Sequence, residues 1–239
     1  MRDGALVQLF KRDALGRVEL VRRAGELAVR RVACGWRWPG SGFVARRLLA
    51  RERRALEALA GLPGVARVLG GDARTLVRSF HPGVPLCRAR SLPRDFFERL
   101  EELARGLHER GVCHNDLHKE ANVLVGDDGY PFLVDFQLAS VHDERGRSFS
   151  VRAREDLRHV WKHRTHYYRA LGVPDPLPSP PPRSALAEGW RRYGKPLYRC
   201  LTRVPLFSAA RDDEARRAPG DPWPTWSAPV GPRVPLTSS

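Results

Sequence analysis

The first third of the chain alternates apolar and polar residues in the manner of β-strands. The alternation runs over Ala5–Val32 and predicts a three-stranded antiparallel meander. Apolar residues at helical spacing follow over Phe43–Ala60, and two further short strands are predicted at Val65–Leu69 and Thr75–Phe80. The expected unit is a small antiparallel sheet that carries one helix.

A pattern dominated by helices begins after Gly83. One amphipathic helix is expected to be capped near Ser91 and to end at Gly111. A hairpin is expected over residues 123–134, because short apolar runs flank a Gly-Asp-Asp-Gly turn, and a second helix is expected over Arg154–Leu171. The chain therefore divides into a strand-rich half and a helix-rich half.

These patterns predict an α+β fold of two lobes. Residues 1–80 form an N-lobe of five strands and one helix, and residues 84–171 form a mainly helical C-lobe. Residues 172–182 hold six prolines and are expected to be a stiff linker. A basic amphipathic helix is predicted over 183–207, where docking onto the second lobe is favoured over membrane binding, and a disordered tail over 208–239.

Composition narrows the classes of partner. The 239 residues carry 42 basic and 27 acidic side chains, a net charge of +15. This charge favours phosphates, nucleic acid or an anionic membrane surface, but an arginine-rich coding bias spread over solvated faces explains it equally well. No helix-turn-helix or pair of metal fingers is seen, so no specific nucleic acid partner is expected. The absence of Cys-x-x-Cys pairs and of a long apolar run indicates a cytoplasmic protein, either free or peripheral at the inner face of the membrane.

Polar residues that could carry chemistry are densest between Cys113 and the predicted hairpin and directly after that hairpin. His114 and Asp116 form a His-x-Asp unit after a short strand, Asn122 follows, and Asp135 with Phe136 ends the hairpin. The arrangement resembles the protein-kinase-like superfamily, whose catalytic loop reads His-Arg-Asp-x-x-x-x-Asn and whose metal-binding strand end reads Asp-Phe-Gly. It is most similar to the atypical bacterial branch of lipopolysaccharide core (Kdo) kinase-like and RIO-like serine/threonine kinases.

This resemblance covers about residues 5–171 and implies a bilobal kinase fold and an ATP- and magnesium-dependent phosphotransferase. Asp116 would accept or orient the proton of the acceptor hydroxyl. Asn122 and Asp135 would complete the catalytic set and hold Mg²⁺, which prefers oxygen ligands. The resemblance leaves two alternatives for the acceptor, a serine or threonine of a protein and a sugar of lipopolysaccharide.

The predicted sheet supplies further groups of the same kind. The segment that contains Ala28 and Arg30 resembles the Val-Ala-Ile-Lys strand of kinases, so Ala28 would cover the adenine and Arg30 would reach the α- and β-phosphates. Glu52 lies in the apolar stripe of the predicted helix, where a carboxylate needs a cation. Arg30 is the expected partner of Glu52, and an arginine of the same helix is the alternative.

The connector between the lobes is expected to bind the adenine through its backbone. It begins with Ser79, Phe80 and His81, which resemblance places beside the nucleotide. If Arg30 is not the phosphate anchor, Arg31 and Lys11 are the next candidates.

Several positions depart from the family pattern. No glycine-rich loop precedes the second strand, where only Gly16 marks the turn, and Asn115 stands in place of the family's Arg. His118 stands where many protein kinases have Lys, and Gln137 replaces the Gly of Asp-Phe-Gly. No Ala-Pro-Glu follows, so regulation by loop phosphorylation is not expected. A nucleotide-binding pseudokinase scaffold and an electrostatic binding module therefore stand beside the enzyme hypothesis.

Two other groupings have an ordinary explanation. His159, His163 and His166 share one face of the last predicted helix and could bind a metal, but a packed or solvated histidine face is favoured. Cys113 directly precedes His114, yet neighbouring residues of a strand point to opposite faces. Cys113 is expected to be a buried filler.

Overall fold

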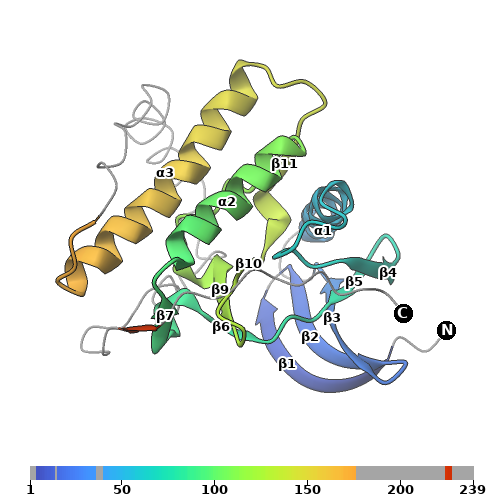
Figure 1. Ribbon diagram of the computed structural model, residues 1–239. Coiled ribbons are helices and arrows are strands. Elements are labelled where there is room, and N and C mark those ends of the chain that lie inside the picture. Colours follow the sequence, from blue (N-terminus) through green and yellow to red (C-terminus); the bar gives the residue numbers. More distant parts are fainter. Residues whose placement is uncertain (1–3, 14, 36–39, 176–223, 228–239) are drawn as a thin grey trace.

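The computed structural model describes residues 4–13, 15–35, 40–175 and 224–227. It has two lobes, one a curved sheet with helix α1 (Ser41–Ala58) and the other centred on two long helices, α2 (Phe96–Glu109) and α3 (Arg147–Ala170) (Figure 1). Within these residues no helix is long and apolar enough to cross a membrane. The bilobal α+β architecture predicted from the sequence is confirmed.

The sheet of the first lobe has five strands in the order β1-β2-β3-β5-β4, and every neighbouring pair is antiparallel. Its strands are β1 (Ala5–Asp13), β2 (Gly16–Arg23), β3 (Glu26–Ala33), β4 (Val68–Gly71) and β5 (Thr75–Ser79). The fourth strand begins later than predicted because Val65 makes a parallel bridge to Leu133 of the other lobe. This bridge and a shared apolar core join the two lobes.

The second lobe surrounds its polar loop with short strands. They are β6 (Gly83–Pro85), β7 (Ser91–Pro93), β8 (Val112–Cys113), β9 (Val123–Gly126), β10 (Pro131–Leu133), β11 (Ser140–Val141) and β12 (Thr225–Ser227). Single turns of 3₁₀ helix occupy Leu86–Arg88, Glu120–Asn122 and Phe136–Leu138. The β9–β10 hairpin and the β8–β11 pair therefore bracket the segment from residue 114 to residue 122.

Helix α3 packs along α2 (Figure 1). Aromatic side chains of the two helices contact each other between them. Phe97 of α2 contacts Tyr167 of α3 with ring centroids 5.5 Å apart, and both side chains are fully buried. Such rings bury large apolar areas and fix the relative position of two helices. This core is the rigid base on which the polar loop lies.

Three predicted boundaries are wrong for local reasons. Ser91 does not cap a helix: Ser91–Pro93 is a strand, and α2 begins at Phe96. Helix α3 begins at Arg147 instead of Arg154, because Phe149 is buried and extends the helix by two turns. Thr225–Ser227, expected to be disordered, pairs in parallel with β7.

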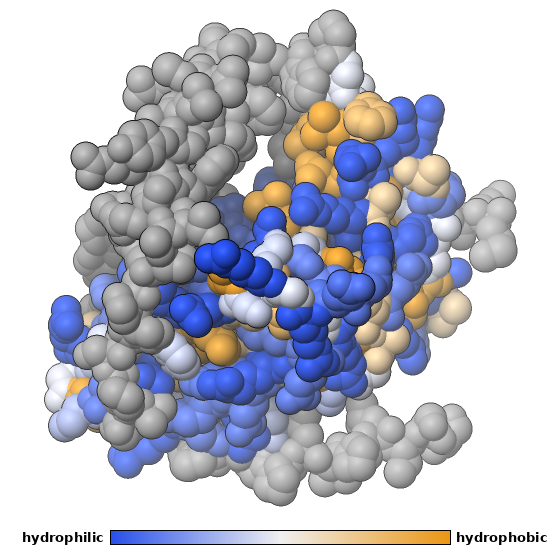
Figure 2. Space-filling model, turned by 90° about the horizontal axis from the view of Figure 1, so that it is seen from above, coloured by the Kyte–Doolittle hydropathy of each residue, from blue (hydrophilic) through white to orange (hydrophobic). Residues whose placement is uncertain are grey.

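The rest of the predicted linker, basic helix and tail, residues 176–223 and 228–239, lies outside the described residues. On the face shown in Figure 2, hydrophilic residues surround smaller groups of hydrophobic ones. The largest exposed apolar side chains of the described part include four on β1, namely Leu6, Val7, Leu9 and Phe10.

Candidate active site

The backbone of the polar loop is anchored by one carboxylate of α3. Asp156, which is 1% exposed, accepts hydrogen bonds from the backbone N–H of His114 at 2.7 Å and of Asn115 at 2.9 Å. Asn115 has φ 64°, a left-handed conformation that asparagine tolerates better than most residues. Sequence reasoning missed Asp156, which is the first of three buried α3 residues that contact the loop.

The other two of these α3 residues hold the loop at a second place. Nε2 of His163 lies 2.8 Å from the carbonyl oxygen of Leu117, and the hydroxyl of Tyr167 donates to Glu120 at 2.7 Å. Burial lowers the pKa of His163, so its ring is neutral. The residues 156, 163 and 167 recur at helical spacing, which lets one helix fix most of the loop.

The predicted histidine face does not form a metal cluster. His163 is buried against the loop and His166 is exposed, while His159 lies beside His118 with ring centroids 5.9 Å apart. The pKa of His159 falls to about 3 because the half-buried ring is poorly solvated and because cationic neighbours, Arg158 first, oppose its protonation. The favoured interpretation is a packed or solvated histidine face, and the arrangement contains both, since His163 is packed and His166 is exposed.

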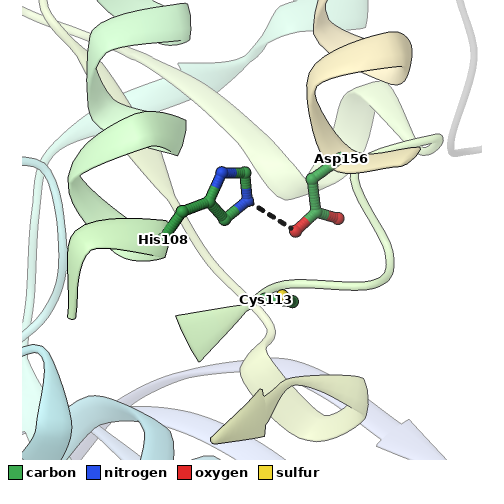
Figure 3. Close-up of side chains that lie close together, drawn as sticks. All are labelled: His108, Cys113 and Asp156. Carbon is green, nitrogen blue, oxygen red and sulfur yellow. Dashed lines mark hydrogen bonds and ion pairs between the residues drawn. The ribbon is translucent and has the colours of Figure 1, made fainter. Parts of the chain in front are cut away.

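Within the described ranges, one group of side chains has the spacing of metal ligands: His108, Cys113 and Asp156, whose ligand atoms lie within 4.8 Å of one another (Figure 3). Nε2 of His108 is 3.3 Å from Asp156, and both oxygens of that carboxylate already accept the backbone bonds of the loop. Burial raises the pKa of the Cys113 thiol to about 12, so it is protonated, whereas metals bind the thiolate. The group is an anchor for the loop, and Cys113 is the buried filler that was expected.

Asp116 lies at the centre of the loop and is surrounded by donors. Its Oδ2 accepts hydrogen bonds from Nζ of Lys119 and Nδ2 of Asn122, each at 2.9 Å, and its Oδ1 lies 3.1 Å from Nδ1 of His118. Burial alone would raise the pKa of this carboxyl, but the bonds from His118 and Lys119 outweigh it and lower the pKa to about 2. Asp116 is therefore ionised at neutral pH.

The two expected metal ligands lie at the same end of the β9–β10 hairpin. The backbone N–H of Val134, directly before Asp135, donates to the carbonyl oxygen of Asn122 at 3.0 Å, one step beyond the last strand pair. Because the Asn122 side chain donates its nitrogen to Asp116, its amide oxygen is at the opposite end of the group. An amide oxygen and a carboxylate thus belong to residues at the same end of the hairpin, and both are ligand types that suit a hard cation such as Mg²⁺.

Asp135 is held in an unusual backbone conformation. It has φ 66° and ψ 63°, and the side-chain nitrogen of Gln137 donates to its Oδ1. The ring of Phe136 packs against His114 with centroids 4.6 Å apart, and Nε2 of His114 is 3.0 Å from the carbonyl oxygen of Val134. A non-glycine residue at positive φ persists only where its surroundings fix it, and these contacts do so.

The cation beside Glu52 is not the one predicted. Glu52 is fully buried, and its carboxylate lies 3.3 Å from Arg31 and 3.5 Å from Arg78, while Arg30 pairs instead with Glu19 at 2.8 Å. Arg31 also lies 3.8 Å from Asp135, so it joins the sheet to the hairpin end. The predicted pair of Arg30 and Glu52 is wrong, as is the alternative that Glu52 pairs within its own helix.

The physical reason is the two-residue period of a strand. Ala28 packs with Val21 and Val77 in a small separate cluster, whereas Leu76, the partner of Arg31 across the strands, belongs to the main core. A shift of one residue exchanges the two faces of a strand. Ala28 and Arg30 therefore lie on the face away from Glu52, and Val29 and Arg31 lie on the face toward it.

The connector residues are half-buried and tied to their neighbours. The backbone N–H of Ser79 donates to the carbonyl oxygen of Arg67 at 2.8 Å, so it is not available to a base, and the Ser79 hydroxyl is 3.1 Å from His81. His81 stacks on Phe132 with centroids 4.4 Å apart, and Phe80 stacks on Phe10 at 6.4 Å. These contacts hold the connector where it leaves β5, an inner strand of the sheet.

The segment after Asp135 is short and pinned at both lobes. Nδ2 of Asn115 donates to the carbonyl oxygen of Leu138, and Nε of Arg51 on α1 donates to that of Ala139, each at 2.9 Å. β11 follows at once, and α3 begins at Arg147. Only a short segment therefore separates Asp135 from α3.

Comparisons with known proteins agree with this geometry at the level of the fold. No protein-family model matches the chain. The Rio2 kinase of Chaetomium thermophilum superposes with a TM-score of 0.54 at 17% identity, covering 73% of this chain and 61% of that one. The described chain therefore has a protein-kinase-like fold.

Two curated proteins share shorter stretches of sequence. A "Probable SapB synthase" of Streptomyces coelicolor is 36% identical over 132 residues, which cover 45% of this chain and 14% of that protein. The "Serine/threonine-protein kinase AtPK1/AtPK6" of Arabidopsis thaliana is 47% identical over 45 residues, which cover 19% of this chain and 10% of that protein. The chain spans only a small part of the length of either relative.

Proposed function

We propose that the protein is an ATP- and magnesium-dependent phosphotransferase that phosphorylates a hydroxyl group. The observation that supports this most is the convergence of residues distant in sequence. Arg31, which is held by Glu52, lies 3.8 Å from Asp135. Asp135 lies at the same end of the β9–β10 hairpin as Asn122, and the Asn122 side chain donates to Asp116. Phosphoryl transfer needs positioned charge more than covalent chemistry. These five residues connect one cation, three carboxylates and one amide through a chain of neighbouring contacts.

Each residue has a role that its contacts support. Arg31 would bind the nucleotide phosphates in place of the kinase lysine, and Glu52 would keep it extended toward them. Asp116 would orient the acceptor, since its carboxylate stays ionised over the working pH range. Asn122 and Asp135 would hold Mg²⁺, which when bound neutralises phosphate charge. Val29, on the face of Arg31, replaces Ala28 as the residue proposed to cover the adenine, and Phe80 and His81 border it.

The acceptor is proposed to be either a protein serine or threonine or a sugar of lipopolysaccharide. The short stretch of sequence shared with a protein described as a serine/threonine kinase supports the first. The truncated segment after Asp135 supports the second, because it leaves little backbone to bind an extended peptide. An association with an anionic membrane surface is part of the second proposal.

One observation favours a second function, a nucleotide-binding scaffold without catalysis. An arginine stands in the place of the kinase lysine, and it contacts the carboxylate of Asp135 as well as that of Glu52. A cation close to Asp135 competes with a metal ion for that carboxylate. Such a protein would bind nucleotide and transfer nothing.

The test uses the full chain with γ-labelled ATP and Mg²⁺. Lipopolysaccharide core fractions and a basic protein substrate are offered separately, with Asp116→Asn as the matched inactive variant. Label in either acceptor that the variant fails to transfer supports the enzyme. Calorimetric binding of ATP without label transfer or phosphate release identifies the scaffold, and absence of both binding and transfer contradicts the two functions together.

A further inference from the structure

One side chain beside Asp116 has contacts that the proposed roles leave unused. His118 projects from the loop with 51% of its side chain exposed, whereas the side chain of Asp116 is 4% exposed. Nδ1 of His118 is 3.1 Å from Oδ1 of Asp116. Of the two residues, His118 is the one that a molecule outside the loop can reach.

Each oxygen of the Asp116 carboxylate already has a hydrogen-bond donor beside it. A carboxylate oxygen offers two lone pairs, and Oδ2 already accepts from Lys119 and from Asn122, each at 2.9 Å. Oδ1 lies beside the donor His118, so an acceptor hydroxyl would have to compete with a bound donor at either oxygen.

The orientation of the imidazole supplies what the carboxylate lacks. When Nδ1–H donates to Asp116, Nε2 on the far side of the ring carries the lone pair. Within the part of the chain that the structure describes, no hydrogen bond to this Nε2 is seen. A carboxylate behind an imidazole fixes its tautomer and stabilises the imidazolium that forms when the ring takes a proton.

We propose that His118 is the general base of the phosphoryl transfer and that Asp116 acts through it. The proposal rests on the proposed function and adds a catalytic residue to it. Nε2 of His118 takes the proton of the acceptor hydroxyl as its oxygen forms a bond to the γ-phosphorus. The bond from that phosphorus to the β,γ-bridging oxygen breaks, and the nucleoside diphosphate leaves with the electron pair.

The neighbours of His118 on α3 are compatible with this role. His159 is neutral at working pH and lies with its ring centroid 5.9 Å from that of His118, so it adds no charge beside the base. Lys119, 34% exposed and bound to Asp116, is a cation that can contact the transferred phosphoryl group. The loop thus presents a base and a cation as separate side chains.

The test measures phosphate release from ATP with Mg²⁺, in which water serves as the acceptor. In His118→Ala, kcat should fall about a hundredfold while calorimetric ATP affinity stays unchanged. Added imidazole should restore part of the rate, because a free base can enter the space of the missing ring. His118→Gln, which can still donate to Asp116, should lose as much rate and gain nothing from imidazole.

Two controls separate a base from a merely structural side chain. Lys119→Met should lose rate without rescue by imidazole, and His166→Ala, an exposed histidine of α3, should behave as the parent with and without imidazole. A parent that releases phosphate together with a fully active His118→Ala overturns the role of His118 and leaves the phosphotransferase intact. Full activity in His118→Gln also overturns it, since Asp116 would then need only a donor. A parent that binds ATP but neither releases phosphate nor labels either acceptor overturns the phosphotransferase and this role with it.

Discussion

The candidate site has two buried carboxylates, Glu52 in the sheet lobe and Asp116 in the helical lobe. They differ in how well they are hydrogen-bonded by the donors around them. Asp116 has three close partners at 2.9 to 3.1 Å. Glu52 faces two guanidinium groups at 3.3 and 3.5 Å, and within the described residues its Oε1 and Nε of Arg78 make no hydrogen bond. The loop carboxylate is satisfied, whereas on the sheet side the donors outnumber the acceptors.

This difference suggests how the two sides divide the work. Two arginines beside one carboxylate leave N–H groups that an anion can use, so the sheet side is suited to bind phosphate. The three donors around Asp116 leave it no need of a further cation, so the loop side is suited to position an acceptor. The proposed assignments follow this division.

The largest expected effect is on the sheet side. Glu52→Leu leaves two mostly buried guanidinium groups without their carboxylate, which should lower the free energy of unfolding by about 3–5 kcal/mol. Urea denaturation measures this change. Glu57→Leu, an exposed position of the same helix, should change it by less than about 0.5 kcal/mol. Equal effects of the two substitutions would mean that Glu52 is not the counter-ion of Arg31 and Arg78.

The next effect is on the loop side and concerns rate. Asp116→Asn removes the charge that orients His118 and Lys119, so phosphate release should fall by at least about a hundredfold, or about 2.7 kcal/mol, with little change in ATP affinity. Asp127→Asn in the exposed turn of the hairpin is the matched control and should be fully active. Unchanged turnover in Asp116→Asn would remove the loop carboxylate from the mechanism.

A smaller effect distinguishes the neighbouring arginines of β3. Arg31→Ala should weaken ATP binding about tenfold, or about 1.4 kcal/mol, and Arg30→Ala less than about twofold, because only Arg31 lies on the face of Glu52 and Asp135. The effects of Arg31→Ala and Glu52→Gln on ATP affinity should be non-additive, since the two groups are in contact. Calorimetry of both single variants and the double variant measures this coupling. A larger loss in Arg30→Ala would restore the assignment made from the sequence.

The contrast between the two carboxylates also explains what the sequence could predict. The partners of Asp116, at positions 118, 119 and 122, belong to one loop, and a local motif identifies such a site. The partners of Glu52 come from β3 and β5, and their choice depends on which face of β3 meets α1. Consecutive arginines at 30 and 31 make both faces look alike in the sequence.

The same limit applies to the scaffold behind the loop. The predicted sheet, helix α2 and hairpin rest on local periodicity, and the structure contains them. Asp156 lies 42 residues from its partner His114, and no local pattern marks such a contact. The strand at Thr225–Ser227 likewise depends on pairing with β7, which is distant in sequence.

The smallest expected effect separates the two sides by their response to acid. Unfolded His159 takes a proton near pH 6.5, whereas folded His159 stays neutral until about pH 3 because it is half-buried and faces cations. Between these values the unfolded chain binds more protons, so stability falls as the pH is lowered. From pH 7.5 to pH 5, His159 should account for a loss of about 1 kcal/mol in the free energy of unfolding, less than full burial would give, since the ring retains some contact with water.

Arginines do not titrate in this range, so Arg30 and Arg31 of the sheet side should add nothing to this loss. His159→Gln should therefore reduce the loss of stability between the two pH values by about 1 kcal/mol, and Arg30→Ala should leave that loss as it is in the parent. Urea unfolding at both pH values measures the difference, and an unchanged pH dependence in His159→Gln would show that the acid response arises elsewhere, with the buried His163 as the next group to replace.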